Sequence, residues 1–327
     1  MFAVSEGNAR QFVDSVEKAG TRMYPQYQWR ALPDDHWAYT IHAPVKGRKP
    51  ALRGLSNGVR ELMVLSAGND LSETFQKRDV KQTGEFATAT NLYFYASEMN
   101  RPRPRLESHA TRFAAAAPTR KSVMIVRASH PGNWNPEPKA LEVFAGVMAD
   151  RLGIGIKMVD GPLATIHQIV PAPDLVIVSG IEEPAFDEAQ LAAIKAYVEA
   201  NGVVLFETPG GRGNFTASAE KTVGEIFGKP VESVLRTRII SGDGLANARN
   251  LGRVDYRPFA LQAFGTRETA PRLRGMIVKP GGQPHVLFSR EDITHALLGQ
   301  PCWGISGYST QSARELMANI VLHATTK

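Results

Sequence analysis

The chain has 327 residues, of which 43% are hydrophobic and 21% are charged, a composition typical of globular proteins with about two domains. Its single cysteine, Cys302, excludes an internal disulfide framework, and its net charge of +6 is spread over both halves, so a nucleic-acid partner is not expected. The sequence contains no run of about eighteen apolar residues and no signal-peptide pattern, so no membrane span is expected in this segment.

The first half of the chain predicts only part of an α/β domain. Residues 61–66 (ELMVLS) are typical of a buried strand, and residues 91–98 (NLYFYASE) are typical of an apolar closing helix. A stretch of alternating arginine and proline at residues 101–105 favours an extended and solvated conformation. We therefore predict a partial domain over residues 1–105, followed by a linker over residues 106–120.

Residues 121–327 predict a second and more regular domain, in which strands alternate with helices. The predicted strands are residues 122–127, 154–159, 174–179, 203–206 and 284–289. Their apolar runs are too continuous for a sheet with one face in water, which indicates a parallel sheet covered by helices on both faces. The predicted fold is an open parallel-sheet α/β layer sandwich, flavodoxin-like in outline.

Local signals predict where the helices of this domain begin and end. Asn135 is expected to cap the first helix, with Pro136 at the first helical position, where its missing N–H costs nothing. Asp187 and Gln190 have the spacing of a capping box. Gly202 is expected to end the helix that follows this box.

The two halves share an order of features that indicates an internal duplication. These features are Leu-Arg-Gly at residues 52–54 and 273–275, a strand, the aspartates Asp70 and Asp292, and closing helices led by Asn91 and Asn319. Short Leu-Arg-Gly matches also arise by chance, but four features in the same order favour a repeat. The first copy lacks the strands and helices that the second copy has between residues 122 and 206.

The second half resembles the bacterial domain of unknown function 4159, whose fold is related to the class I glutamine amidotransferases. The resemblance lies in GNWNPEP at residues 132–138, LVIVSGIEEPAFDEAQ, NGVVLFETPGG and the closing NIVLHATT. The first half is similar to the C-terminal part of another such domain, through Tyr24-Pro25, Leu32-Pro33-Asp34-Asp35-His36, RGLSNGVRELMVLSAGNDLSETFQ and NLYFYASEMNRPRPRL. The resemblance implies an amidotransferase-like fold, no established activity, frequent association with the cell envelope or export, and extra segments upstream.

An amidotransferase places a cysteine nucleophile on a tight turn directly after a central strand, with a histidine as its base. The equivalent turn here, residues 207–213 (ETPGGRG), contains no cysteine. Thr208 is a poor substitute because Pro209 follows it and no base is indicated by spacing, and Cys302 falls on another element. The amidotransferase reaction is therefore predicted to be absent, and we expect no catalytic residue.

The glycines around Arg212 suggest a second interpretation of the same turn, as a binding site for an anion. Gly210, Gly211 and Gly213 could present backbone N–H groups to an anion, together with the guanidinium group. The alternative is a loop that only turns the chain. The pattern matches neither phosphate-loop motif, so no nucleotide or other cofactor is expected.

Polar residues that follow the predicted parallel strands are expected at one crevice, because their loops lie at the same end of the sheet. The candidate ligand-binding residues are His130, Trp134, Glu182, Glu207, Thr208, Gly211 and Arg212. The alternative is that these are ordinary solvated loop residues, and no metal site is expected. The leading hypothesis is a non-catalytic binding or scaffold module of a larger envelope-associated protein, with a protein or a small anionic or carbohydrate ligand as partner. The second hypothesis is a divergent hydrolase that uses acidic residues in the strand-end loops.

Overall fold

The computed structural model describes residues 1–327 except residues 6–8, 69–70, 79–82, 102–120, 280 and 327. The chain forms two units, one of Met1–Glu107 with Pro301–Gly304 and one of Ser108–Gln300 with Ile305–Lys327. The predicted linker at residues 106–120 and the predicted repeat residue Asp70 lie outside the described residues. In the part of the chain that the structure describes, no helix is long and apolar enough to cross a membrane.

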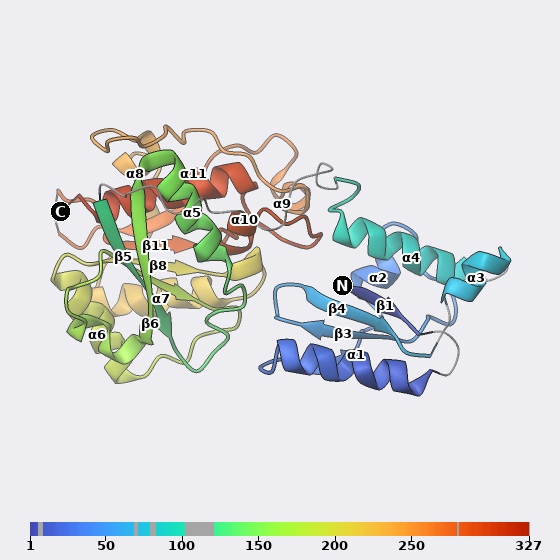
Figure 1. The fold of residues 1–327 in the computed structure, drawn as a ribbon. Coiled ribbons are helices and arrows are strands. Elements are labelled where there is room, and N and C mark those ends of the chain that lie inside the picture. Colours follow the sequence, from blue (N-terminus) through green and yellow to red (C-terminus); the bar gives the residue numbers. More distant parts are fainter. Residues whose placement is uncertain (6–8, 69–70, 79–82, 102–120, 280, 327) are drawn as a thin grey trace. The chain divides into compact units, whose positions relative to one another are not determined.

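The described part of the larger unit contains a seven-stranded sheet in the order β6-β5-β7-β8-β11-β10-β9 (Figure 1). The strands are β5 (Lys121–Ser129), β6 (Ile154–Pro162), β7 (Leu175–Ser179), β8 (Val203–Glu207), β9 (Glu232–Ser233), β10 (Arg274–Met276) and β11 (Val286–Ser289). Strands β6, β5, β7, β8 and β11 pair in parallel, whereas β10 is antiparallel to both β11 and β9. The expectation of an all-parallel sheet is therefore wrong at this edge, where the short connection from β10 to β11 permits only a hairpin.

Helices cover both faces of this sheet, as the continuous apolar runs predict. The helical elements are α5 (Ala140–Leu152), η1 (Leu163–Gln168), α6 (Glu188–Glu199), η2 (Pro209–Gly211), α7 (Phe215–Phe227), α8 (Arg238–Ser241), α9 (Pro258–Phe264), α10 (Thr294–Leu298) and α11 (Thr310–Ala324). Alternate strand residues enter two separate cores: Leu205 packs with α5 and α11, and its neighbour Phe206 packs with α6 and α7. The larger unit is thus a three-layer α/β structure built on a largely parallel sheet.

Two of the predicted helix ends are wrong, and one is confirmed. Asn135 does not cap α5, which begins at Ala140, because Pro138 disfavours helical backbone at the residue before it. At the end of α6 the left-handed residue is Asn201, with φ of 69°, rather than Gly202. The capping box of Asp187 and Gln190 is present at the start of α6, with both reciprocal hydrogen bonds formed.

The smaller unit has a four-stranded sheet, among its described residues, in the order β1-β4-β3-β2. Its elements are β1 (Phe2–Val4), α1 (Arg10–Met23), β2 (Trp29–Ala31), α2 (Trp37–Thr40), β3 (Leu52–Ser56), β4 (Glu61–Ser66), α3 (Leu71–Lys77) and α4 (Thr83–Ala96). Strand β1 pairs with β4 in parallel, and β3 is antiparallel to both β4 and β2.

This order and these directions are the same as those of β8-β11-β10-β9 in the larger unit. The glycine of each Leu-Arg-Gly motif also has the same surroundings. A Cβ atom at Gly54 would lie 2.5 Å from Leu32 Cδ2, and a Cβ atom at Gly275 would lie 2.7 Å from Val234 Cγ1. In both units the close neighbour donates its backbone N–H to the leucine of the motif: Leu32 to Leu52 at 3.0 Å, and Val234 to Leu273 at 3.4 Å. Both motifs therefore need glycine for close strand packing.

A buried asparagine on the closing helix of the larger unit holds a distant loop. Asn319 on α11 donates from Nδ2 to the carbonyl oxygens of Ile239 and Arg249, both at 2.7 Å. Its Oδ1 accepts the backbone N–H of Arg249 at 3.0 Å. The amide thus fixes both α8 and the loop that follows it against α11.

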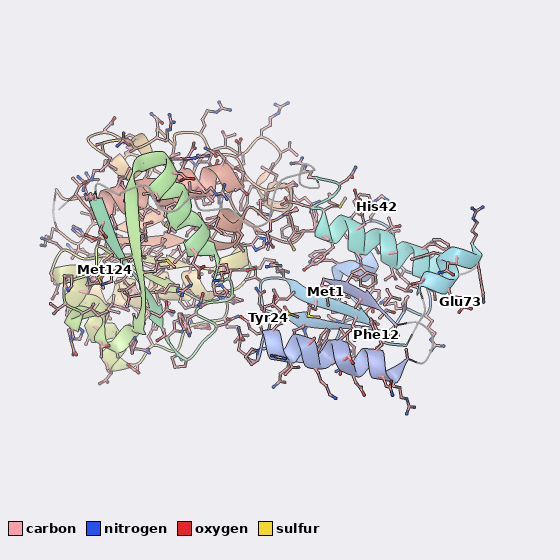
Figure 2. All side chains as sticks on the ribbon, viewed as in Figure 1. Met1, Phe12, Tyr24, His42, Glu73 and Met124 are labelled. Atoms are coloured by element: carbon pink, nitrogen blue, oxygen red, sulfur yellow. The ribbon has the colours of Figure 1, made fainter. Side chains whose placement is uncertain are left out.

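The smaller unit contains the equivalent contact on α4. Asn91 is buried and donates from Nδ2 to the carbonyl oxygens of Ala38 at 3.2 Å and Ala43 at 2.9 Å. Its Oδ1 accepts the backbone N–H groups of Ala43 at 2.9 Å and of His42 at 3.1 Å; His42 is labelled in Figure 2. Each unit therefore fastens its first short helix and the following loop to its closing helix through one asparagine.

We expect Asn319→Ala to lower the free energy of unfolding by about 3 kcal/mol, because one buried and two partly buried hydrogen bonds to backbone groups are lost. Denaturant unfolding followed by circular dichroism measures this loss. The control is Asn250→Ala, at an exposed residue whose side chain accepts only the N–H of Gly252, and it should change stability by less than about 0.5 kcal/mol. Equal effects of the two substitutions would contradict the clamp.

Candidate functional site

The predicted site residues follow β5, β7 and β8, whose carboxyl ends lie at the same edge of the sheet because these strands are parallel. His130 comes directly after β5, and Glu182 lies just beyond β7. Glu207 is the last residue of β8, and Thr208 follows it. Their environments differ strongly. Glu182 is exposed, His130 is half-buried, and Glu207 and Thr208 are almost completely buried. The structure therefore places at most a part of the predicted set in contact with solvent.

Both ring nitrogens of His130 are occupied by backbone groups. Nε2 lies 2.8 Å from the carbonyl oxygen of Ser179, which can only accept, and Nδ1 accepts the N–H of Gly132 at 3.1 Å. The ring stacks on Phe215 with a centroid distance of 5.4 Å. Burial lowers the pKa of His130 below its ordinary value, so the neutral Nε2–H form is favoured. This histidine joins the β5 and β7 loops and has no free nitrogen for acid–base work.

Trp134 lies in a loop that Arg127 of β5 holds in place. The Arg127 guanidinium forms a bidentate ion pair with Asp160, at 2.7 and 2.9 Å, and also donates to Asn135 Oδ1 and the Pro138 carbonyl oxygen, both at 3.1 Å. It lies 5.9 Å from the centre of the Trp134 ring. The cavity beneath this loop has a volume of about 10 Å³, which is room for about one water molecule. The cavity directly beneath this loop therefore has no space for an organic ligand.

Thr208 lies at the turn directly after β8, and its hydroxyl is fully engaged in hydrogen bonds. Thr208 Oγ1 accepts the N–H of Thr216 at 3.0 Å and lies 2.8 Å from Thr216 Oγ1. Since Thr216 Oγ1 donates to the carbonyl oxygen of Ser289 at 3.0 Å, the proton between the two hydroxyls belongs to Thr208. No histidine or carboxylate is in a position to remove this proton through any hydrogen bond that Thr208 makes among the described residues.

Gly211 is required by packing, and Arg212 beside it is exposed. Gly211 has a φ of +62°, and a Cβ atom there would lie 1.6 Å from the carbonyl oxygen of Ser306. Gly213 has a φ of +132° and would meet the carbonyl oxygen of Ile181 at 2.1 Å. The N–H of Gly210 donates to Asp292 Oδ1 at 2.7 Å. The glycines thus let the chain pass between neighbouring loops, and Gly210 already donates to a carboxylate of the protein.

Glu207 and Asp292 together satisfy the first four backbone N–H groups of the segment that opens α10. Glu207 Oε1 accepts from Ile293 at 2.8 Å and from Thr294 at 2.6 Å, and Glu207 Oε2 accepts from the Thr294 hydroxyl. Asp292 Oδ1 accepts from His295 at 3.0 Å, and Oδ2 accepts from Ala296 at 2.9 Å. Both carboxylates are completely buried. They act here as caps for a buried helix start.

Burial, followed by the neighbouring Asp292 carboxylate, raises the pKa of Glu207 from 4.5 to about 7. The hydrogen bonds from Thr294 and Ile293 oppose this rise but do not cancel it. Glu207 is therefore a candidate proton carrier by its pKa, but it has no solvent-exposed atom through which a substrate could reach it.

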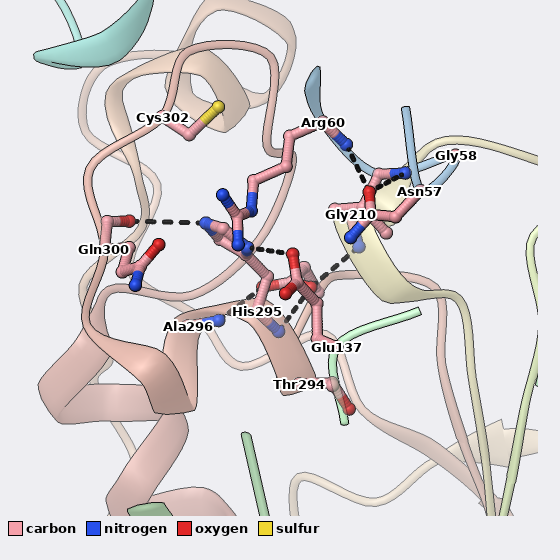
Figure 3. A network of polar contacts seen from close by, with 12 residues as sticks. Asn57, Gly58, Arg60, Glu137, Gly210, Thr294, His295, Ala296, Gln300 and Cys302 are labelled. Carbon is pink, nitrogen blue, oxygen red and sulfur yellow. Dashed lines mark hydrogen bonds and ion pairs between the residues drawn. The ribbon is translucent and has the colours of Figure 1, made fainter. Parts of the chain in front are cut away.

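A second buried pair is formed by Glu137 and His295 of α10 (Figure 3). His295 Nδ1 lies 3.0 Å from Glu137 Oε1, and His295 Nε2 lies 3.3 Å from the carbonyl oxygen of Gln300. Because that carbonyl can only accept, Nε2 donates to it, and Nδ1 faces the Glu137 carboxylate. Sequence reasoning did not single out this pair, since its members are 158 residues apart.

No group of three or more histidine, cysteine, aspartate or glutamate residues in the described part of the chain is arranged to hold a metal ion. The lone Cys302 is buried and its thiol donates to the carbonyl oxygen of Trp303. A scan of family models, a search of curated proteins and a search of solved structures each gave no significant match for the chain.

The stability of the protein should fall between pH 4.5 and 7 because of Glu207. A carboxyl whose pKa is higher in the folded state binds its proton more tightly when folded, so deprotonation above its unfolded pKa of about 4.5 favours unfolding. Glu207→Gln removes this charge and keeps an acceptor for α10. We expect the variant to gain a few kcal/mol relative to the unsubstituted chain between pH 4.5 and 7, as measured by denaturant unfolding across this range. Glu182→Gln, at an exposed residue, is the control. Parallel pH profiles for all three proteins would contradict the raised pKa.

Gly211→Ala should lower the free energy of unfolding by at least about 3 kcal/mol, because its Cβ atom has no space beside the Ser306 carbonyl group. The matched control is Gly244→Ala, since Gly244 has a similar φ of +70° and no atom within 4 Å of an added Cβ. The control should cost only about 1–2 kcal/mol for the left-handed backbone. Thermal unfolding measures both, and equal losses would show that φ alone decides the cost.

Proposed function

We propose that this chain is a non-catalytic binding module with an amidotransferase-like, flavodoxin-like fold. The observation that carries the proposal is the turn after β8, where Thr208 takes the place of a nucleophile and donates its proton to Thr216. Among the described residues this hydroxyl donates to no base, and the residue Thr208 is 1% exposed. A nucleophile needs both an acceptor for its proton and access to substrate, and Thr208 has neither.

We propose that the chain belongs to the family of the domain of unknown function 4159. It is supported by the sequence segments named above and by a largely parallel sheet with helices on both faces. With that family comes the proposal that the chain is part of a larger bacterial protein associated with the cell envelope. Its partner would be a protein or a small anionic or carbohydrate ligand.

We further propose that the smaller unit is a partial duplicate of the larger one. Three independent features support this: the matching order and direction of four strands, the glycine of the Leu-Arg-Gly motif, and the asparagine clamp on the closing helix. A shared strand order alone occurs in unrelated folds. The same side chain with the same backbone partners at both positions is harder to explain without common ancestry.

A divergent hydrolase is the second candidate, and the observation in its favour is Glu207. Its pKa, raised by burial and by the Asp292 carboxylate to about 7, is typical of a carboxyl group that acts as a catalytic acid. Against this candidate, each carboxylate accepts backbone N–H groups of α10 and neither is accessible. Hydrolysis of chromogenic esters or glycosides that is lost in Glu207→Gln would favour the hydrolase.

The non-catalytic proposal predicts that a chloromethyl ketone analogue of glutamine leaves Thr208 unmodified, and that glutamine yields no ammonia above the blank. Intact mass followed by peptide mapping separates the peptide of Thr208 from that of Cys302. Thr208→Val, which removes the hydroxyl, should behave identically. An adduct on Thr208 that is absent from this variant would overturn the proposal.

A further inference from the structure

A cavity of the larger unit lies away from the turn after β8 and is lined by none of the residues discussed there. It is lined by α5, by α11 and by the loop that follows α8, and its volume is about 540 Å³. This volume falls within the range of about 300–1,000 Å³ that small-molecule sites occupy. We call it the α5–α11 groove.

Apolar side chains form one part of the groove. Met148 and Leu152 come from the last turns of α5, and Ala318 comes from α11. Met148 is almost completely buried and belongs to the core of that face of the sheet, so this wall is rigid. It offers apolar contact to a ligand without any rearrangement of the core.

The polar part of the groove is strongly basic. Arg151, Arg249 and Arg314 line it, against the single acid Glu315, which accepts a hydrogen bond from Gln311. Arg314 donates from Nε and a terminal nitrogen to the carbonyl oxygen of Leu297, at 3.3 and 3.0 Å.

The structure assigns no acceptor among the described residues to the guanidinium groups of Arg151 and Arg249, and both side chains are exposed. Two guanidinium groups with open hydrogen-bonding capacity therefore face the same cavity. A guanidinium group pairs with a carboxylate or a phosphate through two parallel hydrogen bonds.

The position of Arg249 is fixed by the asparagine clamp. Asn319 accepts the N–H of Arg249 at 3.0 Å and donates to its carbonyl oxygen at 2.7 Å, so the backbone that carries the guanidinium group is held on both sides. In the smaller unit the equivalent clamp holds Ala43, which has no charge. The asparagine clamp thus positions an arginine beside the groove in the larger unit and an uncharged alanine in the smaller unit.

We propose that the α5–α11 groove binds a small organic anion that joins one carboxylate or phosphate group to an apolar body. Arg151 and Arg249 bind the charged group, and the wall formed by Met148, Leu152 and Ala318 contacts the apolar body. This site goes beyond the proposed function and does not depend on it, because reactivity at Thr208 would leave the groove unchanged.

Isothermal titration of the full chain with decanoate and with decyl phosphate tests the proposal and distinguishes the two anionic groups. We expect saturable binding of at least one probe to a single site, and weaker binding of decan-1-ol, which lacks the charge, and of acetate, which lacks the chain. Arg151→Ala and Arg249→Ala should each weaken binding about tenfold, since each removes a charge-assisted hydrogen-bonding group. Ala318→Leu, which fills the apolar wall, should weaken it to a similar extent.

The matched control is Arg253→Ala, at an exposed arginine that does not line the groove, and it should leave affinity within about twofold. Unchanged thermal unfolding of each variant establishes that lost binding is not lost folding. Absence of saturable binding by both anions would overturn the proposal. Equal affinity for decan-1-ol, or binding unaffected by Arg151→Ala and Arg249→Ala, would overturn it as well.

Discussion

The capping of α10 by two buried carboxylates is the interaction on which the architecture of the strand-end region depends. Glu207 at the end of β8 and Asp292 beyond β11 accept four successive backbone N–H groups, and Asp292 also accepts from Gly210 in the turn after β8. One network thereby fixes two strands, one helix and the turn after β8. Burial of Glu207, followed by the charge of the neighbouring Asp292, raises the pKa of Glu207, and burial of both acids makes the network costly to break.

This network also explains why polar groups at the carboxyl ends of β5, β7 and β8 are occupied by contacts within the protein. Acids that cap a helix cannot also face a ligand, the ring of His130 bridges two backbone groups, and Arg127 holds the Trp134 loop over the remaining space. Polar residues collect where parallel strands end, as ligand sites in such sheets do. In this protein the hydrogen-bonding groups of Glu207, Thr208 and His130 are used within the fold, and the α5–α11 groove is an open concave surface elsewhere in the same unit.

The same asparagine clamp occurs in both units, where it holds different residues. Asn91 and Asn319 make equivalent contacts with backbone groups. In both units the glycine of the Leu-Arg-Gly motif also packs closely against the side chain that follows β2 or β9. The residue held by the clamp is free to vary, because only its backbone is bound: it is Ala43 in one unit and Arg249 in the other. Because the clamp binds only backbone groups, it can hold a charged residue in one unit and an uncharged residue in the other.

The sequence by itself determined what depends on neighbours along the chain. Apolar runs predicted the strands and the two covered faces, Asp187 and Gln190 predicted a capping box, and the segment ETPGGRG excluded a cysteine at the turn. Only the tertiary structure decided that Glu207 caps α10, that β9 and β10 are antiparallel, that Glu137 pairs with His295, and that Arg151 and Arg249 share a groove. The physical reason is that desolvation and hydrogen-bond partners come from segments up to 158 residues apart, whereas helix caps and strand periodicity arise within a few residues.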